Sequence, residues 1–162
     1  MTLITRRGLL AASAATAASL MLPARARAQT GRMAISATSR TLEVKGRAAK
    51  VWGLTNAQGG QGLVLDPGQA FAVDLTNDLP EPTLIHWHGQ IPPHDQDGVP
   101  DLPMPALRPG ETRSYDYAPR AGTYWMHSHI PLQEMNLLAA PLIVRSPADL
   151  AADRQEGGAV PA

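Results

Sequence analysis

The sequence predicts an all-β fold, arranged as a two-sheet sandwich or a Greek-key barrel. Short segments alternate apolar and polar residues with a period of two, which is typical of half-buried strands. The 15 prolines and 14 glycines are spread along the 162 residues and separate these segments with turn signals. No apolar stripe at helical spacing follows residue 28. Many short strands with frequent turns favour a sandwich or a barrel over a helical architecture.

Alternation alone predicts three strands, over residues 41–45, 69–75 and 112–117. Gly46 follows the first of these segments and marks a turn. Asp-Pro-Gly and Arg-Pro-Gly triplets stand shortly before the second and the third segments, and both triplets are typical of turns.

Three further strands are predicted over residues 83–88, 123–129 and 137–144. The first two contain most of the histidines of the chain, and the third is almost continuously apolar. Pro141 interrupts the third segment. Because proline cannot donate a hydrogen bond to a β-ladder, Pro141 predicts an edge strand or a bulge at this position.

The first 28 residues are typical of a cleaved signal peptide. A short basic region is followed by an uncharged stretch rich in alanine and leucine, and then by the small-x-small cleavage sequence Ala26-Arg27-Ala28. The uncharged stretch is about 15 residues, shorter than the roughly 20 that span a bilayer, so no membrane span is expected after cleavage. The twin arginine Arg6-Arg7 resembles a Tat signal and predicts export to a bacterial periplasm.

The rest of the chain is predicted to be one domain, residues 29–147, with a linker-like tail over residues 148–162. Cleavage removes four of the basic residues and no acidic one, so the net charge falls from 0 to −4. This balance leaves no basic stripe for nucleic acid and no polybasic patch for a membrane. The chain has no cysteine, which excludes disulfides and thiolate ligands.

Two His-x-His motifs hold four of the five histidines: His86-Trp87-His88 and His127-Ser128-His129. A strand rises about 3.3 Å per residue and its side chains alternate between faces, so each motif projects two imidazoles to one side, about 6.6 Å apart. Imidazole is the commonest metal ligand among side chains. The two motifs therefore predict a metal site made of His86, His88, His127 and His129.

The other candidate residues are predicted to have structural roles. His94 lies in a proline-rich loop and is interpreted as a solvated histidine. Met126 is flanked by strand residues and is expected to pack in the core. Trp87 and Trp125 are expected to pack around the four histidines and to shield them from water.

Four blocks of the sequence carry a family resemblance. They are Thr-Leu-Ile-His-Trp-His-Gly at 83–89, Gln-Asp-Gly-Val-Pro at 96–100, Gly-Thr-Tyr-Trp-Met-His-Ser-His at 122–129 and Leu-Ala-Ala-Pro-Leu-Ile-Val at 138–144. In this order they resemble the first cupredoxin domain of the multicopper oxidases, the laccase-like family. The resemblance covers about residues 33–147. It implies a plastocyanin-like, cupredoxin-type Greek-key β-sandwich, in agreement with the strand pattern.

The resemblance also implies copper as the cofactor. In the family, a trinuclear copper cluster lies between the first and the last cupredoxin domains, and each of these domains supplies four histidines. Matched position by position, His86 corresponds to a ligand of the type 2 copper. His88, His127 and His129 correspond to ligands of the type 3 pair.

Asp97 is the candidate catalytic residue that the resemblance implies. The matching acid in the family lies outside the copper ligands and assists proton delivery to reduced oxygen. The sequence leaves a second interpretation of Asp97 open, because an aspartate followed by glycine is also a common turn.

The resemblance is incomplete, because a complete family member binds a type 1 copper through a His-Cys-His strand in its last domain. A chain without cysteine cannot build that site. We therefore expect the isolated chain to be inactive, as the product of a truncated, frameshifted or split gene. The remaining cupredoxin domains would come from a separate chain, and dioxygen would be the substrate of the completed enzyme.

Two alternatives to an oxidase domain follow from the same residues. The first is a periplasmic copper-binding module that uses the four histidines for copper storage or delivery without oxidase activity. The second is a mononuclear metalloprotein of the cupin type, with zinc, iron or manganese. Cupins usually place a glutamate shortly after the first His-x-His motif, and residues 90–98 contain none, so the sequence disfavours this second alternative.

Overall fold

Two four-stranded sheets form the domain in a computed structural model, which describes residues 31–99 and 103–156. The expected signal peptide, residues 1–28, lies outside these described residues. The strands are β1 (Met33–Val44), β2 (Arg47–Asn56), β3 (Leu63–Leu65), β4 (Phe71–Asn77), β5 (Ile85–His88), β6 (Thr112–Tyr117), β7 (Gly122–Ser128) and β8 (Ala139–Val144). A short 3-10 helix, η2 (His94–Gln96), follows β5, and the helix α2 (Pro147–Glu156) follows β8.

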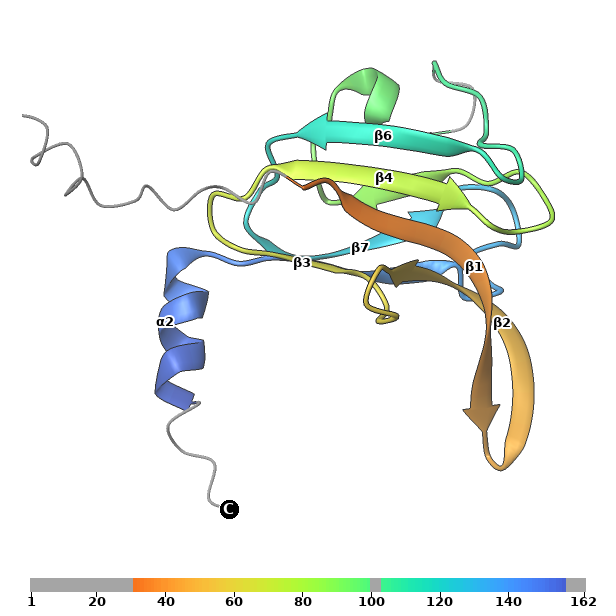
Figure 1. Ribbon diagram of the computed structural model, residues 1–162, viewed down its shortest axis with the longest axis horizontal. Helices are drawn as coiled ribbons and strands as arrows, with labels where there is room; N and C mark the ends of the chain where they lie inside the picture. Colours follow the sequence, from red (N-terminus) through yellow and green to blue (C-terminus); the bar gives the residue numbers. More distant parts are fainter. Residues whose placement is uncertain (1–30, 100–102, 157–162) are drawn as a thin grey trace, which may run out of the picture. The chain divides into compact units, whose positions relative to one another are not determined.

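The strand order is β2-β1-β4-β6 in one sheet and β3-β8-β7-β5 in the other (Figure 1). β1 pairs with β4 in parallel, as β3 does with β8, while the other neighbours are antiparallel. Strands that neighbour in a sheet are thus often distant in sequence, as in a Greek-key sandwich. The all-β prediction is confirmed.

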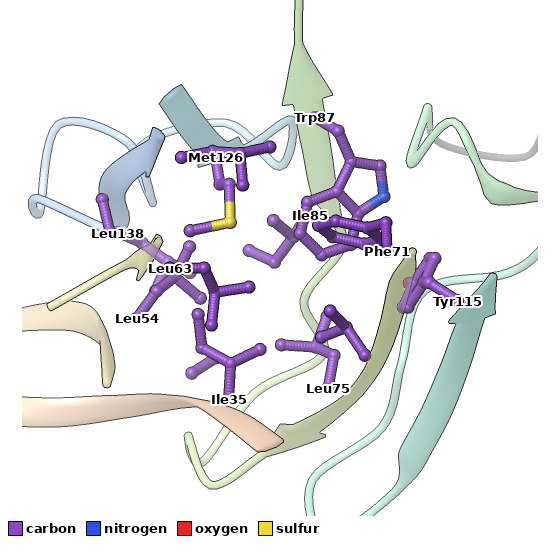
Figure 2. Packing of buried hydrophobic residues seen from close by; sticks show 14 of the residues in the cluster. Ile35, Leu54, Leu63, Phe71, Leu75, Ile85, Trp87, Tyr115, Met126 and Leu138 are labelled. Atoms are coloured by element: carbon purple, nitrogen blue, oxygen red, sulfur yellow. The ribbon is translucent and has the colours of Figure 1, made fainter. Parts of the chain in front are cut away.

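The core lies between the inner faces of the two sheets. β4 shows the expected alternation, because Phe71, Val73 and Leu75 are fully buried while the residues between them are partly exposed. The opposite sheet contributes Trp87, whose indole contacts the rings of Phe71 and Tyr115 edge to face, with both pairs of ring centroids 4.9 Å apart (Figure 2). These large buried side chains join the two sheets.

The six predicted strands are present, and β2 and β3 were missed. β2 does not alternate cleanly because it is the outer strand of a hairpin with β1, and only Gly53 and Leu54 in it are buried. The hairpin turn is made by Lys45 and Gly46, both of which have positive φ angles. β1 also begins at Met33, eight residues before the predicted start at residue 41.

The prediction that Pro141 marks an edge strand or a bulge was wrong for the strand as a whole. β8 lies between β3 and β7, so it is an interior strand. Pro141 pairs with Trp125 of β7, but β3 pairs only from Leu142 onward. Proline is tolerated because the ladder on the β3 side begins one residue later and does not need its missing N–H.

The segment expected to be a linker contains the helix α2. Ser146 and Asp149 cap its start: the Asp149 carboxylate accepts a hydrogen bond from the Ser146 N–H, and the Ser146 hydroxyl accepts one from the Asp149 N–H. Pro147 takes the first helical position, where its fixed φ is favourable. The boundaries 29–147 and 148–162 stay predictions. Among the described residues, no helix combines the length and the apolarity that crossing a bilayer requires.

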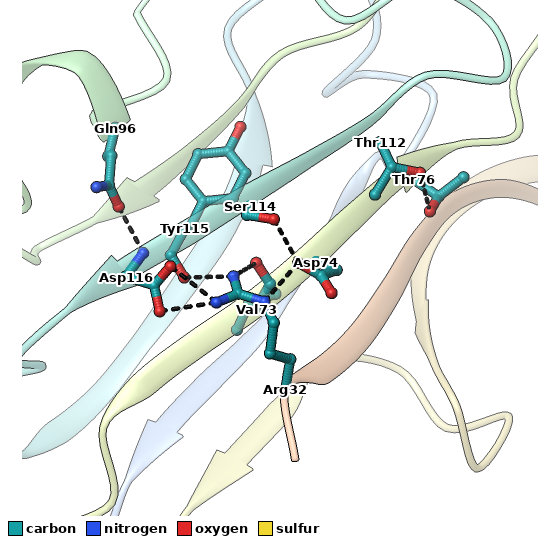
Figure 3. Close-up of polar contacts among 9 residues, drawn as sticks. All are labelled: Arg32, Val73, Asp74, Thr76, Gln96, Thr112, Ser114, Tyr115 and Asp116. Atoms are coloured by element: carbon teal, nitrogen blue, oxygen red, sulfur yellow. Dashed lines mark hydrogen bonds and ion pairs between the residues drawn. The ribbon is translucent and has the colours of Figure 1, made fainter. Parts of the chain in front are cut away.

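Arg32, which precedes β1, links the start of this strand to β4 and β6 of the same sheet (Figure 3). Its guanidinium donates to the carboxylates of Asp74 at 2.6 Å and of Asp116 at 2.8 Å. The hydrogen bond from the Ser114 hydroxyl lowers the pKa of Asp74, and the hydrogen bond from Arg32 lowers it further. Next to this cluster, the side-chain carbonyl of Gln96 accepts a hydrogen bond from the Asp116 N–H at 2.7 Å. This bond attaches η2, and with it the loop that carries Asp97, to β6.

Candidate metal centre

The pairing of β5 with β7 brings the two His-x-His motifs together. His86 lies directly opposite His127, and His88 lies opposite Trp125. Side chains alternate between the two faces of each strand, so Trp87 and Met126 point into the core while the histidines point to the outer face. The alternation thus separates the residues that build the core from those that build the site.

The four histidine rings form one cluster. The centroid of the His86 ring lies 5.7 Å from that of His88, 5.6 Å from that of His127 and 4.8 Å from that of His129. One ring nitrogen of each of His86, His127 and His129 lies within 4.8 Å of the others. His127 is buried, His86 is partly buried, and His88 and His129 are exposed. The cluster is therefore open to solvent on one side.

His88 completes the cluster through its contact with His127. The Nδ1 atom of His88 and the Nε2 atom of His127 are 3.4 Å apart. Imidazole nitrogens bind a zinc ion at about 2.0–2.1 Å, so two of them on one tetrahedral ion of similar size lie about 3.3–3.4 Å apart. This pair therefore fits two ligands of a single metal ion. Nitrogen donors without any thiolate also suit copper in its oxidised state.

Asp97 contacts His86 through both its carbonyl and its carboxylate. The Nδ1 atom of His86 is 2.8 Å from the Asp97 carbonyl oxygen and 3.4 Å from the Asp97 carboxylate. Gly98 permits this approach, because it has a φ of +74° and a Cβ there would overlap the carbonyl oxygen of Ile85. Asp97 thus contacts a predicted ligand and also forms the turn, and its role in proton delivery stays a prediction.

A second carboxylate, that of Glu134, lies next to the Nδ1 atom of His127. The Nδ1 atom of His127 is 3.1 Å from the Ser128 carbonyl oxygen and 3.2 Å from the Glu134 carboxylate. Glu134 could not be found from the sequence, because this residue lies in an irregular turn and no motif spacing relates it to the histidines. Trp125 stacks on the ring of His127, with the ring centroids 4.1 Å apart and an angle of 15° between the planes.

The cluster favours neutral histidine at His129. Partial desolvation lowers the pKa of His129, and the nearby His86 and His127 lower it further, against opposing effects of Asp97 and Glu134. Only the neutral imidazole has a lone pair with which to bind a metal. The surroundings of His129 therefore favour the form that can be a ligand.

The structure separates the remaining candidates. Met126 is fully buried in the core, as predicted. His94 is exposed on η2 and is not in the group of histidines that, among the described residues, could hold a metal ion. Trp125 shields His127 as expected, but the prediction that Trp87 packs around the histidines was wrong. Trp87 points to the opposite face of β5, and its indole N–H donates to the Gln96 carbonyl at 3.0 Å.

Comparison with known proteins identifies the family. The family profile described as multicopper oxidase matches residues 36–149. The chain belongs to the multicopper oxidase family. It is 32% identical over 140 residues to copper resistance protein A of Escherichia coli, a match that covers 85% of this chain and 23% of that relative. It is 37% identical over 102 residues to laccase-2 of Botryotinia fuckeliana, covering 60% of this chain and 18% of that relative.

Solved structures agree with this assignment. The McoA multicopper oxidase of Aquifex aeolicus superposes with a TM-score of 0.65 at 29% identity, over 77% of this chain and 29% of that one. The laccase of Botrytis aclada superposes with a TM-score of 0.61 at 31% identity, over 70% of this chain and 22% of that one. The sandwich is therefore cupredoxin-like, and membership of the family implies copper as the cofactor. The chain spans about a fifth of the length of the curated relatives that it matches.

Proposed function

We propose that His86, His88, His127 and His129 supply half of the ligands of a trinuclear copper centre that reduces dioxygen to water. His86 is assigned to the type 2 copper, and the other three histidines are assigned to the type 3 pair. The observation that carries this proposal is the β5–β7 pairing, which gathers all four rings on one face of the sheet. Copper, when bound, would transfer electrons to dioxygen. The chain itself would supply the four histidine ligands.

Asp97 is proposed to move protons at this site. Its carboxylate is partly exposed and lies 3.4 Å from the Nδ1 atom of His86, so it can exchange protons with solvent while it stays beside a ligand. Its backbone carbonyl holds the Nδ1 hydrogen of His86, which leaves the Nε2 atom free to bind copper. The carboxylate of Asp97 would thus exchange protons, while its backbone carbonyl would orient His86.

The remaining ligands are proposed to come from further cupredoxin domains. Large apolar side chains near the histidines in the chain are exposed: Ile91, Trp125, Leu132 and Met135 have relative exposures of 75%, 38%, 69% and 80%. Contiguous exposed apolar surface is typical of a face that another domain covers, and these side chains are proposed to belong to such a face. This supports an open half-site that needs a partner.

Copper titration tests the ligand set. The variant His88→Ala/His127→Ala should lose most copper(II) binding and keep its circular dichroism spectrum, because these side chains lie on the outer face of the sheet. His94→Ala is the matched control and should bind as the unchanged chain does. Equal binding by the double variant, or a larger loss from His94→Ala, would contradict the assignment.

Export is proposed to precede function. The twin arginine and the Ala26-Arg27-Ala28 sequence support Tat transport to the periplasm and a mature protein that begins near Gln29. Sequencing the N-terminus of protein from the periplasmic fraction tests this. Recovery of the uncleaved chain from the cytosol would reject it.

A copper-binding module without oxidase activity is the second candidate. The match to a protein named copper resistance protein A over 85% of this chain favours it. The two candidates differ in what happens when the other domains are supplied. A storage or delivery module would bind copper and remain inactive as an oxidase, whereas an oxidase domain would gain oxygen consumption with the complementing domains.

A further inference from the structure

The turn between β7 and β8 brings a carboxylate to the buried histidine of the cluster. The Glu134 carboxylate lies 3.2 Å from the Nδ1 atom of His127. The His127 side chain has a relative exposure of 8%, whereas that of Glu134 is 48% exposed. A glutamate this exposed is free to adopt many rotamers, so its position against His127 depends on how firmly the backbone of the turn is held.

Gln133, the residue before Glu134, fixes that backbone. Its side-chain oxygen accepts hydrogen bonds from the Thr83 hydroxyl at 2.7 Å and from the Ser128 hydroxyl at 2.8 Å. Its side-chain nitrogen donates to the Glu81 carboxylate at 2.8 Å and to the Pro82 carbonyl at 2.9 Å. Gln133 is 1% exposed, and all four of these bonds are made by its amide. The turn is thereby attached to the strand ends that carry the histidines.

The backbone of the turn adopts conformations that leucine rarely takes. Leu132 and Leu137 have φ angles of 69° and 66°, in the left-handed region. Both side chains are exposed, so burial of these leucines does not stabilise the conformation. Hydrogen bonds from the N–H groups of Asn136 and Leu138 to the Gln133 carbonyl, at 3.1 and 3.0 Å, hold the turn instead. Strained backbone persists only where its surroundings determine it in this way.

We propose that Glu134 is a positioning residue for His127. Its carboxylate accepts the hydrogen of Nδ1, so that Nε2, the atom that faces His88, carries the lone pair that binds copper. The arrangement matches that of His86, whose Nδ1 atom also faces a carbonyl and a carboxylate. The two histidines that lie directly opposite each other are thus held by the same kind of contact from two different loops. This inference rests on the proposed role of His127 as a ligand.

Variants of Glu134 in the full chain test the proposal. Glu134→Ala removes the acceptor, Glu134→Met removes it at similar side-chain length, and Glu134→Gln keeps a carbonyl that can accept the same hydrogen bond. Asp78→Asn is the matched control for loss of a negative charge, since Asp78 is an exposed residue that follows β4 in the other sheet. Two quantities are measured: the tautomer of His127 from its ring nitrogen chemical shifts in metal-free protein, and the copper(II) affinity by titration.

In the unchanged chain we expect the tautomer of His127 with hydrogen on Nδ1. Glu134→Ala and Glu134→Met should shift it toward a mixture and weaken copper(II) binding about tenfold, the lower end of the range for such outer contacts, because the Ser128 carbonyl remains as an acceptor. Glu134→Gln should keep the tautomer and most of the affinity, and Asp78→Asn should change neither.

Either of two results would overturn the role of Glu134. One is an unchanged tautomer and affinity in both Glu134→Ala and Glu134→Met, which would assign the positioning to Ser128 alone. The other is a loss in Glu134→Gln equal to that in Glu134→Ala, which would make charge the cause. If the unchanged chain binds no copper, the proposed function fails, while the tautomer measurement still tests Glu134 by itself.

Discussion

The two faces of the β5–β7 pair differ in their chemistry although they come from adjacent residues. On the inner face, Trp87 and Met126 are fully buried and pack against residues of the other sheet. On the outer face, the Nδ1 atoms of His86 and His127 contact the loop residues Asp97 and Glu134. Along a strand, core residues and metal-site residues alternate, so a single substitution can change the stability of the fold without changing metal binding, or the reverse.

The largest expected effect is on the inner face. Trp87→Ala should lower the free energy of unfolding by about 3–5 kcal/mol, because it leaves a cavity among Phe71 and Tyr115 and removes their edge-to-face contacts. Urea denaturation followed by circular dichroism measures this change. His86→Ala on the same strand is the comparison and should alter stability far less. Similar losses from the two variants would show that the faces are not independent.

Gly98→Ala tests the close approach between β5 and the loop whose Asp97 carbonyl contacts His86. An added Cβ would overlap the Ile85 carbonyl and would also require a φ of +74° in alanine, so the loop must move away from β5. We expect a loss of about 1–3 kcal/mol of stability, in the range for backbone strain. We also expect weaker copper binding, because the Asp97 carbonyl would leave the Nδ1 atom of His86. Ala substituted for Gly110, where a Cβ has open space, is the control for positive φ alone.

The core could be predicted from the sequence more fully than the support of the metal centre. Alternation and turn signals located β4 and β6, because a half-buried strand shows its period of two directly. The spacing of the histidines also identified the residues that the structure gathers in one cluster. Trp87 was placed on the wrong side, since adjacency to His86 in sequence suggested adjacency in space, whereas strand alternation turns it to the core.

Glu134 and Gln133 could not be found from the sequence for a different reason. They act through an irregular turn whose course depends on hydrogen bonds to Thr83 and Ser128. Thr83 is distant in sequence, and Ser128 is the middle residue of the second His-x-His motif. No period or local propensity reports such contacts. Support of this kind is visible only after the strands have been assembled.

The chain by itself should show no intense blue absorption when loaded with copper(II). That absorption requires a copper–thiolate bond, and none of the 162 residues is a cysteine. Only the weak absorption of copper bound to nitrogen ligands is expected, together with negligible oxidation of phenols or of cuprous ion. Visible spectra and an oxygen electrode measure both quantities. Robust oxygen consumption by the pure, copper-loaded chain would contradict the proposal that its half-site needs a partner.

The smallest expected effect concerns a polar cluster that serves structure alone, around Asp74 in the other sheet. The Ser114 hydroxyl and Arg32 lower the pKa of Asp74 below its unfolded value of about 3.9. The stabilisation is therefore fully present above that value and is lost as the pH falls through the lower pKa of the folded state. Ser114→Ala should reduce the dependence of unfolding free energy on pH between about 5 and 3, and only slightly, because Asp74 is about a third exposed to solvent.

Copper titration of the same variant at neutral pH completes the comparison, because Ser114 and the histidines lie on different sheets. We expect unchanged affinity. If Ser114→Ala weakens copper binding as well, the link is the Gln96 side chain, which joins Asp116 beside this cluster to the loop of Asp97. Gln96→Ala would then weaken binding to the same degree. That outcome would make the polar surface of one sheet part of the support for His86, and the separation of structure from chemistry would hold only within the β5–β7 pair.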